Sequence, residues 1–390
     1  MRILQASYII PLNAAPIAKG YLYIEDDGTI IHMGQEAPIT DQFEVEVYEG
    51  ILCPGFVNTH CHLELSHMKG MMPEDSGLPS FIDQIPKQRQ KSTDDLVAVM
   101  KRVDCEMHEA GIVAVGDISN SDVSIPVKSE STIRYHSFVE LFGLNKSEAS
   151  QLQEEGEKKV KKFETADLSA SLVPHAPYSV SPSLLEGIYN HSKGSLLSIH
   201  HQETRSENEL FMKGEGDLAD VLLKKELDLS AHLNCGKNSS DFSLISYLPA
   251  HQKILLVHNT YSTAKDIDRV MKHFEAAYWC TCPKANWYIE RRLPDYHLWR
   301  EKGLKITIGT DSLASNDTLS ILDEMKLIQK QYPNIPTDEL LSWASKNGAD
   351  FFDYKTLGSF KAGNKPGVIL IEKVDGLQLT PESKVRVLAH

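Results

Sequence analysis

Two histidines two residues apart, His60 and His62, follow an apolar segment that begins near Ile51. In an extended strand, side chains at positions i and i+2 point to the same face, so both imidazoles would leave the strand on one side. Two imidazoles on one face of a strand end make half of a metal site. An ordinary polar pair is the alternative, and further ligands at other strand ends decide between the two.

Four later apolar runs also end in ionisable side chains. In chain order these residues are His175, His200, His258 and Asp311, and Glu203 follows three residues after the second of them. A single histidine after a strand is usually an ordinary polar residue. Ionisable groups at the ends of five separate runs are not explained by packing alone, so the sequence predicts a shared site.

Imidazoles combined with one carboxylate are ligands suited to zinc or a similar divalent ion. Such a site leaves room for a water, whose pKa the ion lowers to about 7, so that hydroxide is available at neutral pH. The predicted metal ligands are His60, His62, His200 and Asp311.

Two further side chains are expected to act beside this metal. Glu203 is better kept off the ion, where a carboxylate can move a proton between the water and a leaving nitrogen. His258 would hydrogen-bond the water or the developing oxyanion, and together with Asp311 it would orient the attacking hydroxide. The predicted catalytic residues are therefore Glu203, His258 and Asp311.

The elements that must position these residues alternate along the middle of the chain. Eight short apolar runs are separated mostly by helical stretches with charged faces, such as 94–110, 147–162, 182–191 and 265–274. This pattern predicts a (β/α)8 barrel, whose chemistry lies at the C-terminal ends of its strands. A doubly wound sheet is disfavoured because no G-x-G-x-x-G follows the early strands. The runs are 51–57, 111–115, 133–141, 168–173, 195–199, 254–257, 276–279 and 304–308.

Short strands flank the barrel at both ends of the chain. Residues 20–25 and 29–33 are separated by Asp-Asp-Gly and predict a β-hairpin, and 367–372 reads as another strand. We therefore expect a small β-sandwich formed by both termini. The predicted units are 1–52 and 356–390 for this β-sandwich and 53–355 for the barrel.

Composition limits the partners. The 390 residues are 41% hydrophobic and 24% charged, as in ordinary globular proteins. The net charge of −14 argues against binding nucleic acid or an anionic membrane surface. The six cysteines lack C-x-x-C spacing and suggest a reduced chain. The first residues lack the apolar core of a signal peptide, and no apolar run approaches the roughly 18 residues that span a bilayer, so we expect a cytoplasmic protein.

Taken in order, the motifs resemble those of the amidohydrolase superfamily, in the branch that holds guanine deaminase, triazine hydrolases and related nucleoside deaminases. The resemblance covers essentially the whole chain. It implies the same four metal ligands, Glu203 as the acid/base, His258 assisting the water, His175 bordering the substrate, and a pocket lined by the 282–286 segment that ends in Asn286. The matching segments are P-G-F-V-N-T-H-C-H, V-P-H-A-P-Y, H-H-Q-E-T, L-V-H-N-T, C-P-K-A-N and I-G-T-D-S-L-A-S-N.

Two departures from the superfamily pattern matter. Members with two metals bridge them with a carboxylated lysine on the fourth strand, and residues 168–178 contain no lysine. We therefore expect one Zn²⁺ per chain, although the ligands also suit Fe²⁺. The segment 358–367 matches the superfamily's closing G-K-x-A-D turn only loosely, which leaves the boundary of the β-sandwich open.

The segment H-C-H-L-E-L-S at 60–66 looks like that of aminodeoxyfutalosine deaminases within this branch. Glu64 either faces the substrate or is a buried carboxylate paired with a basic neighbour. Arg89, Arg134 and Arg205 are candidates for contacting an anionic or hydroxylated substrate, with a surface ion pair as the alternative for each.

The sequence thus predicts a zinc-dependent aminohydrolase that releases ammonia from an amino-substituted purine, pyrimidine, nucleoside or related ring. The same site could hydrolyse an amide or displace another leaving group, such as chloride. A cytidine-deaminase type is disfavoured, because H-x-E followed by P-C-x-x-C is absent. An inactive binding or scaffold relative is the remaining alternative. The expected partner is a small-molecule substrate. Members of the superfamily commonly form homodimers, and the sequence leaves the oligomeric state open.

Overall fold

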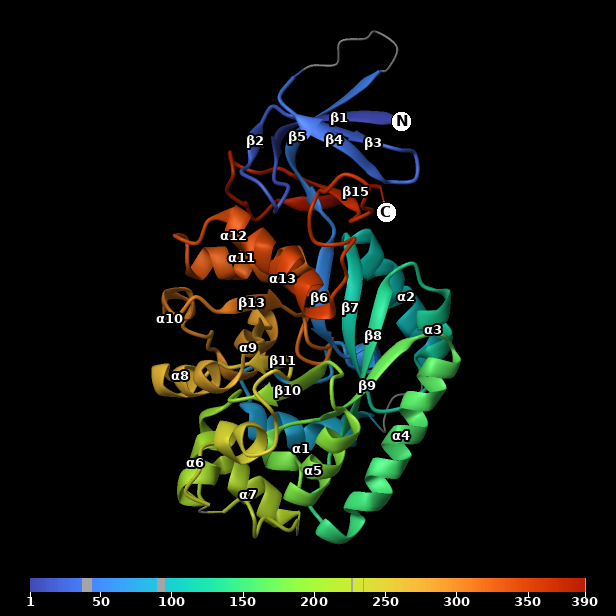
Figure 1. The fold of residues 1–390 in the computed structure, drawn as a ribbon. Helices are drawn as coiled ribbons and strands as arrows, with labels where there is room; N and C mark the ends of the chain where they lie inside the picture. Colours follow the sequence, from blue (N-terminus) through green and yellow to red (C-terminus); the bar gives the residue numbers. More distant parts are fainter. Residues whose placement is uncertain (37–43, 90–94, 226, 234, 390) are drawn as a thin grey trace.

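The computed structural model describes residues 1–36, 44–89, 95–225, 227–233 and 235–389. A barrel forms the body of the molecule, and a small β unit built from both ends of the chain caps it (Figure 1). Within the described residues, no helix is both long enough and apolar enough to cross a membrane.

The barrel contains eight parallel strands in two four-stranded sheets, so the predicted (β/α)8 fold is confirmed. Its strands are almost entirely buried, as expected for parallel strands covered by helices on the outside and filled by side chains on the inside. The first sheet comprises β6 (Phe56–Cys61), β7 (Ile112–Ser119), β8 (Arg134–Leu141) and β9 (Ser169–Pro174). The second comprises β10 (Leu197–His201), β11 (Ile254–His258), β12 (Ala277–Thr281) and β13 (Lys305–Ile308).

Two seams join the sheets into a closed barrel. At one seam, the backbone N–H of His200 on β10 donates to the carbonyl of His175, just after β9, at 2.9 Å. At the other, the carbonyl of His60 on β6 accepts from the backbone N–H groups of Thr310 and Asp311, which follow β13, at 3.0 and 3.1 Å. Four of the residues singled out from the sequence therefore lie at the seams.

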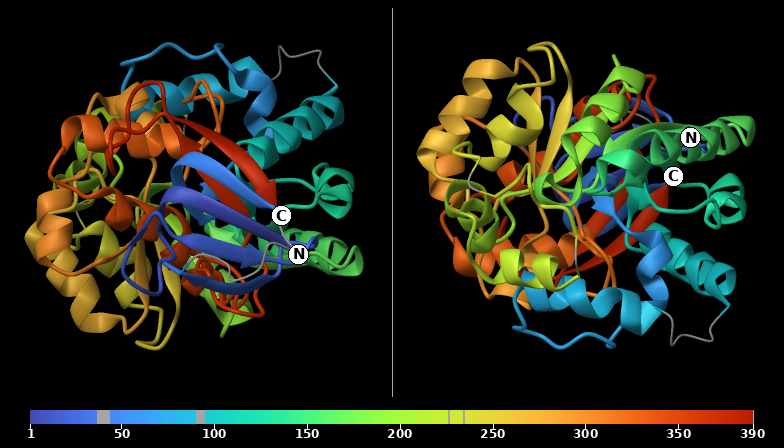
Figure 2. Two further views of the ribbon diagram at one scale, coloured as in Figure 1. Left: turned by 90° about the horizontal axis from the view of Figure 1, so that it is seen from above. Right: turned by 90° about the horizontal axis from the view of Figure 1, so that it is seen from below.

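Helices cover the outside of the barrel, with α2, α3 and α4 along the first sheet (Figures 1 and 2). Helices α1 and α5–α7 gather at the end remote from the small β unit. The helices are α1 (Leu78–Arg89), α2 (Leu96–Glu109), α3 (Ile125–Glu130), α4 (Ala149–Thr165), α5 (Pro182–His191), α6 (Arg205–Lys213), α7 (Asp217–Lys224), α8 (Ala264–His273), α9 (Pro283–Glu290), α10 (Tyr296–Glu301), α11 (Ile321–Gln331), α12 (Thr337–Leu341) and α13 (Asn347–Phe352).

The two ends of the chain form one mixed seven-stranded sheet in the order β15-β14-β5-β1-β3-β4, with β2 paired to β1. The predicted hairpin is present as β3 and β4, which pair antiparallel. A separate apolar core that includes Leu22, Leu52 and Phe360 holds this small β unit together. Its strands are β1 (Arg2–Ile9), β2 (Ile17–Ala18), β3 (Tyr21–Ile24), β4 (Ile30–Gly34), β5 (Val45–Pro54), β14 (Val368–Glu372) and β15 (Lys384–Ala389).

The first apolar run, 51–57, serves both parts of the molecule. Strand β5 ends at Pro54 in the small β unit, and β6 begins at Phe56 in the barrel. Proline has no N–H to give to a ladder, and Gly55 packs so closely on Val113 that a Cβ there would lie 2.4 Å from Val113 Cγ1. The apolar run therefore forms two strands in different sheets, β5 and β6, which are separated at Pro54 and Gly55.

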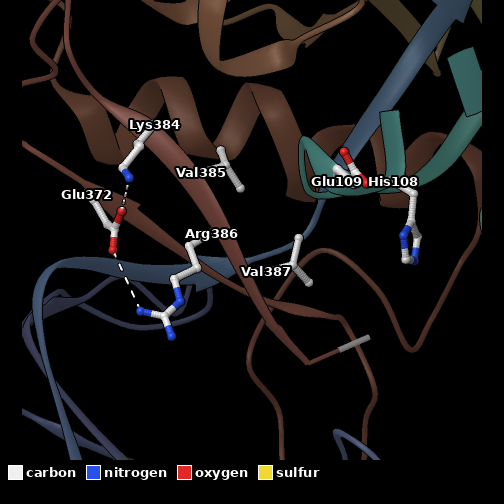
Figure 3. A pocket seen from close by; sticks show the side chains of 7 residues that line it. All are labelled: His108, Glu109, Glu372, Lys384, Val385, Arg386 and Val387. Atoms are coloured by element: carbon white, nitrogen blue, oxygen red, sulfur yellow. Dashed lines mark ion pairs between the residues drawn. The ribbon is translucent and has the colours of Figure 1, made fainter. Parts of the chain in front are cut away.

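An open hollow of about 420 Å³ lies where the small β unit meets the end of α2 (Figure 3). Glu372 on β14 pairs there with Lys384 at 3.1 Å and with Arg386 at 3.9 Å, both from β15. His108 and Glu109 from α2 complete the wall. The charges of β14 and β15 neutralise one another, so this hollow serves the junction between the two parts.

Gly309 allows the close approach of β13 to β6. A Cβ at this position would lie 2.8 Å from His60 Cβ, 2.9 Å from His60 O and 3.0 Å from Cys280 Sγ, and none of these atoms can move without shifting a strand. We expect Gly309→Ala to lower the free energy of unfolding by about 1–3 kcal/mol, measured by urea denaturation. Gly187→Ala on α5 is the control, because a Cβ there meets only the flexible Gln153 side chain. Equal stability of Gly309→Ala and wild type would contradict the close packing.

Candidate metal centre and active site

Three imidazoles and one carboxylate meet where β6, β10 and β13 end. The Nε2 atom of His62 lies 3.1 Å from Nε2 of His60 and 3.3 Å from Nε2 of His200. Asp311 Oδ1 lies 3.4 Å from His62 Nε2 and 3.9 Å from His60 Nε2. Tetrahedral zinc with Zn–N bonds of 2.0–2.1 Å separates its ligand atoms by about 3.3 Å. The three histidines therefore offer ligand atoms close enough together to hold one ion, and Asp311 lies beside two of them.

Two imidazoles of this cluster, those of His60 and His200, are held neutral. Burial, followed by the neighbouring imidazoles, lowers the pKa of His60 well below its ordinary value. Burial also lowers the pKa of His200 to about 4. Neutral rings present a lone pair to a metal, whereas protonated rings cannot bind one.

The carboxyl group of Asp311 is also buried, which raises its pKa to about 6. The hydroxyl of Ser315 donates to Asp311 Oδ2 at 3.0 Å, which leaves Oδ1 facing the histidines. Ser315 thus fixes the orientation of the carboxyl group through Oδ2, and Oδ1 is the oxygen that can bind a metal.

Hydrogen bonds at the far edges of two rings set which nitrogen faces the site. The Nδ1 of His200 donates to the carbonyl of His175 at 2.9 Å, so its Nε2 points a lone pair at the cluster. The Nδ1 of His258 lies 2.7 Å from the side-chain oxygen of Asn286 and donates to it. The Nε2 of His258 is thereby left as an acceptor, 3.6 Å from Glu203 Oε1.

Glu203 lies beside the cluster, two residues after the end of β10. Its carboxyl group is buried, and this burial, with the charges of Asp311 and Glu290, raises its pKa well above the ordinary value. The Glu203 carboxyl therefore holds a proton more tightly than an exposed carboxyl does. The arrangement places a buried acid next to a neutral imidazole, as proton transfer requires.

Three residues at the strand ends have left-handed backbone conformations, which side chains other than glycine rarely adopt. The φ angles are 46° at Gln202, 73° at His258 and 57° at Asp311. Each such residue costs of order 1–3 kcal/mol and persists only where the surroundings impose it. Glu207 supplies part of that constraint, because its buried carboxylate accepts from the backbone N–H of Gln202 at 3.0 Å. This contact fixes the turn that carries Glu203.

A pocket of about 560 Å³ opens onto the cluster. Apolar side chains from α1, including Phe81, Ile82 and Ile85, form one wall, and Leu222 on α7 and Phe142 after β8 extend it. The polar groups that line this pocket include Asn120, Glu140, His175, Ser179, His200, Glu203, His258 and Asp311. The pocket thus joins a reactive end to a largely apolar chamber.

Of the three residues predicted to contact substrate, one lines the pocket and two are buried behind it. His175 lines the pocket, with Nδ1 2.7 Å from the hydroxyl of Ser179 and a pKa lowered to about 4 by burial. Asn286 is buried and holds His258. Glu64 is buried outside the lining, where it accepts from the N–H and hydroxyl of Ser121 at 3.2 and 3.1 Å.

The three candidate arginines do not gather at the pocket. Arg134 lies over the ring of Tyr354, 4.9 Å from its centre, at the start of β8. Arg205 is exposed and pairs with Glu209 at 2.9 Å. The side chain of Arg89 lies outside the described part of the chain.

Sequence reasoning missed two buried glutamates that the structure places at the site. Glu140 is at the end of the third apolar run, so the strand-end rule that found the histidines would also have found it. Glu207 lies one helical turn after Glu203 and reads as a surface residue of α6, although its side chain is fully buried.

The family model for the amidohydrolase family matches residues 51–389. The chain belongs to the amidohydrolase family. It is accordingly a hydrolase acting on C–N bonds, as predicted. The match covers the whole barrel and continues into the C-terminal part of the small β unit.

The relatives share this architecture at low identity. An adenosine deaminase of Helicobacter pylori is 26% identical over 334 residues, which cover 83% of this chain and 80% of the relative. The crystal structure of H. pylori aminofutalosine deaminase in complex with methylthio-coformycin superimposes with a TM-score of 0.85 at 21% identity, covering 100% of this chain and 98% of that one. Atrazine chlorohydrolase TrzN from Arthrobacter aurescens, complexed with zinc, gives 0.76 at 16% identity, with 100% and 95% covered.

Removing the metal is expected to destabilise the protein. An ion that binds only the folded state adds about 4 kcal/mol when its free concentration is 1,000 times its Kd. We therefore expect a chelator to lower the thermal unfolding midpoint and one equivalent of zinc per chain to restore it.

His62→Ala should abolish that zinc response. The control is His136→Gln, because His136 is a buried histidine bonded to Ser169 and Ser171 at the other end of the barrel strands. This variant should lose stability while keeping the response to zinc. Zinc binding by His62→Ala at wild-type stoichiometry would contradict the proposed ligand set.

The buried carboxyl of Glu324 predicts that the stability of the protein depends on pH. Glu324 accepts from Lys284 N at 2.7 Å and from Asn316 Nδ2 at 2.8 Å, and burial raises its pKa from 4.5 to about 8. Between these values the folded protein holds a proton that the unfolded chain has lost, so the contribution of Glu324 to stability falls as pH rises from about 4.5 to 8. We expect a flatter dependence of the unfolding midpoint on pH for Glu324→Gln, and no such change for the exposed control Glu301→Gln. Identical slopes in wild type and Glu324→Gln would contradict the raised pKa.

Proposed function

We propose that the protein is a zinc-dependent aminohydrolase that releases ammonia from the amino-substituted ring of an adenosine-like nucleoside. The observation that carries this proposal is the buried carboxyl of Glu203, whose pKa is raised by burial and which lies 3.6 Å from His258 Nε2, beside the histidine cluster. Hydrolytic loss of ammonia from such a ring needs a proton delivered to a ring nitrogen.

The donor set supports zinc as the metal. His60, His62, His200 and Asp311 would hold it, because imidazole nitrogens and a carboxylate oxygen are ligands that zinc takes in proteins, and the three histidines form a ready cluster. Zinc in such a site supplies an activated water by lowering the pKa of that water to about 7.

The proton steps fall to Glu203. Its raised pKa suits it to take a proton from the attacking water and place it on the ring nitrogen next to the amino-bearing carbon. The carboxylate then removes the proton of the newly added hydroxyl group and passes it to the amine, which leaves as ammonia as the carbonyl forms. The same group thus alternates between base and acid.

His258 would orient the attacking water by accepting a hydrogen bond from it. The hydrogen bond to Asn286 keeps the Nδ1 proton in place, and burial holds the pKa of the ring at about 3, so it stays neutral. A neutral ring with its Nε2 acceptor toward the site can receive a hydrogen bond from the water. Asp311 Oδ1 faces the same space and can orient the same molecule.

Two features favour an adenosine-like substrate. Relatives that cover most of the chain are named adenosine deaminase and aminodeoxyfutalosine deaminase, and the structural neighbour with a TM-score of 0.85 binds methylthio-coformycin. The pocket is about 560 Å³ and mostly apolar, which suits a flat ring with an attached group. His175 is proposed to contact the ring from the side of β9.

The proposal is tested by ammonia release from zinc-loaded protein. The panel comprises adenosine, S-adenosylhomocysteine, aminodeoxyfutalosine, guanine, cytosine and melamine. We expect turnover of the adenosine-type members. Turnover of none of them, with one metal per chain confirmed, would overturn the aminohydrolase proposal and favour hydrolysis of an amide or of another leaving group.

Glu203→Gln is expected to keep the metal and to lose turnover by about 10²–10⁴-fold, because an amide cannot deliver the proton. Metal content by elemental analysis and kcat by ammonia release are the two readouts. Glu186→Gln, an exposed residue of α5, serves as the matched control and should behave as wild type. A variant at Glu203 that retains wild-type turnover would refute the proton-transfer role.

A further inference from the structure

Glu140 is a buried carboxylate in the pocket to which the proposed mechanism gives no task. It is the second-to-last residue of β8, and Phe142, two positions later, lines the same pocket. Strand geometry turns both side chains to one face, so β8 presents a carboxylate and then an exposed ring to the ligand space. The Glu140 side chain is 4% exposed.

The two oxygens of Glu140 differ in their surroundings. Oε2 accepts from Asn120 Nδ2 at 3.0 Å. Oε1 has no hydrogen-bond partner among the described residues. The nearest donor, His200 Nδ1, is 3.5 Å away and gives its proton to the carbonyl of His175 at 2.9 Å. A buried polar atom left unsatisfied costs about 1–3 kcal/mol, and at a pocket wall the ligand is the natural source of the missing donor.

The position of this oxygen relative to the metal centre limits what that donor can be. His200 faces the metal ligands with Nε2 and faces Glu140 with Nδ1, so the width of one imidazole ring separates Glu140 from the metal position. In an aminopurine nucleoside, the amino-bearing carbon and the sugar lie at opposite ends of the ring system. With the reacting carbon at the metal, the sugar lies farther along the pocket, and Glu140 lines this pocket on the side of His200 that faces away from the metal.

We propose that Glu140, held by Asn120, binds the sugar hydroxyls of a ribonucleoside substrate. A carboxylate oxygen accepts hydrogen bonds from hydroxyl groups, and the two adjacent hydroxyls of ribose can share it. The inference rests on the proposed aminohydrolase function and narrows its substrate class to ribonucleosides, excluding free bases. Glu140 thus becomes a specificity-determining residue.

A second metal ion is a poorer occupant of this place. Glu140, His175 and His200 offer atoms close enough together to suggest one. The Nδ1 of His200 is occupied by its bond to the backbone, and its Nε2 faces the first cluster. Two protein ligands would remain, fewer than the three or four that zinc sites in proteins use.

The experiment compares adenosine with 2′,3′-dideoxyadenosine in wild type and in Glu140→Gln. The amide can keep its oxygen toward Asn120 and so turns an N–H₂ group to the pocket in place of an acceptor. We expect Glu140→Gln to lose about 10–100-fold in kcat/KM on adenosine and less than threefold on the dideoxy substrate. Wild type should prefer adenosine by a similar factor. Glu148→Gln, an exposed glutamate outside the pocket, is the matched control and should match wild type on both.

Equal losses on the two substrates, or equal use of them by wild type, would overturn the inference while leaving the aminohydrolase function intact. Equal losses together with reduced zinc content would instead assign Glu140 to the positioning of His200. Release of no ammonia from any nucleoside by zinc-loaded wild type is the separate failure of the proposed function.

Binding of the products provides a readout that does not need turnover. Calorimetry with inosine and 2′,3′-dideoxyinosine should show wild type favouring inosine, and Glu140→Gln losing that preference. The thermal midpoint of each variant shows whether it folds. Loss of affinity for both ligands in a folded variant would overturn the proposal.

Discussion

The seam between β6 and β13 is the constraint on which the site depends. A barrel of parallel strands closes only if the last strand pairs with the first, and here the pairing runs through a single carbonyl, that of His60. That carbonyl accepts from the N–H groups of Thr310 and Asp311, residues about 250 positions away in sequence. The hydrogen bonds that close the fold therefore also bring a carboxylate to two histidines. Side chains reinforce the seam, since Asn58 donates to Thr310 Oγ1 at 2.8 Å.

Closure of the barrel also explains the shifted pKa values of the clustered side chains. Once the strands meet, the imidazoles and carboxyls at their ends are removed from water, and burial is the largest cause of every pKa shift in the cluster. Burial keeps the rings of His60 and His200 neutral, as metal binding requires, and raises the proton affinity of Glu203, as acid catalysis requires. Left-handed backbone at His258 and Asp311 is the local strain that the arrangement tolerates, and it is outweighed by the packing of the barrel around it.

Sequence reasoning reached the barrel and the metal ligands for the same reason. A strand end followed by an imidazole is a local pattern, and parallel strands in a barrel bring all such ends to one place. The same rule applies to Glu140 at the end of its strand, but Glu207 has no such pattern, because it lies on a helix and its burial depends on packing across the fold. The apolar wall of α1 was equally hidden, since the position of this helix depends on contacts with α7 and α9. Gly55 is a third case, because its close contact with Val113 marks the break between β5 and β6, which the uniform apolar run 51–57 does not reveal.

The two half-sheets divide the work of the site. Strands β10–β13 carry His200, His258 and Asp311, with Glu203 on the turn after β10, so groups that move protons or hold the metal lie largely on the second sheet. The ends of β7, β8 and β9 supply Asn120, Glu140 and His175, which face the pocket beyond the metal cluster. At one seam, the backbone N–H and the Nδ1 of His200 both donate to the carbonyl of His175 and so tie the halves together. Strand β6 of the first sheet carries His60 at the other seam, so changes at the ends of β7, β8 and β9 can alter what the pocket recognises while β6 and the second sheet keep the metal cluster in place.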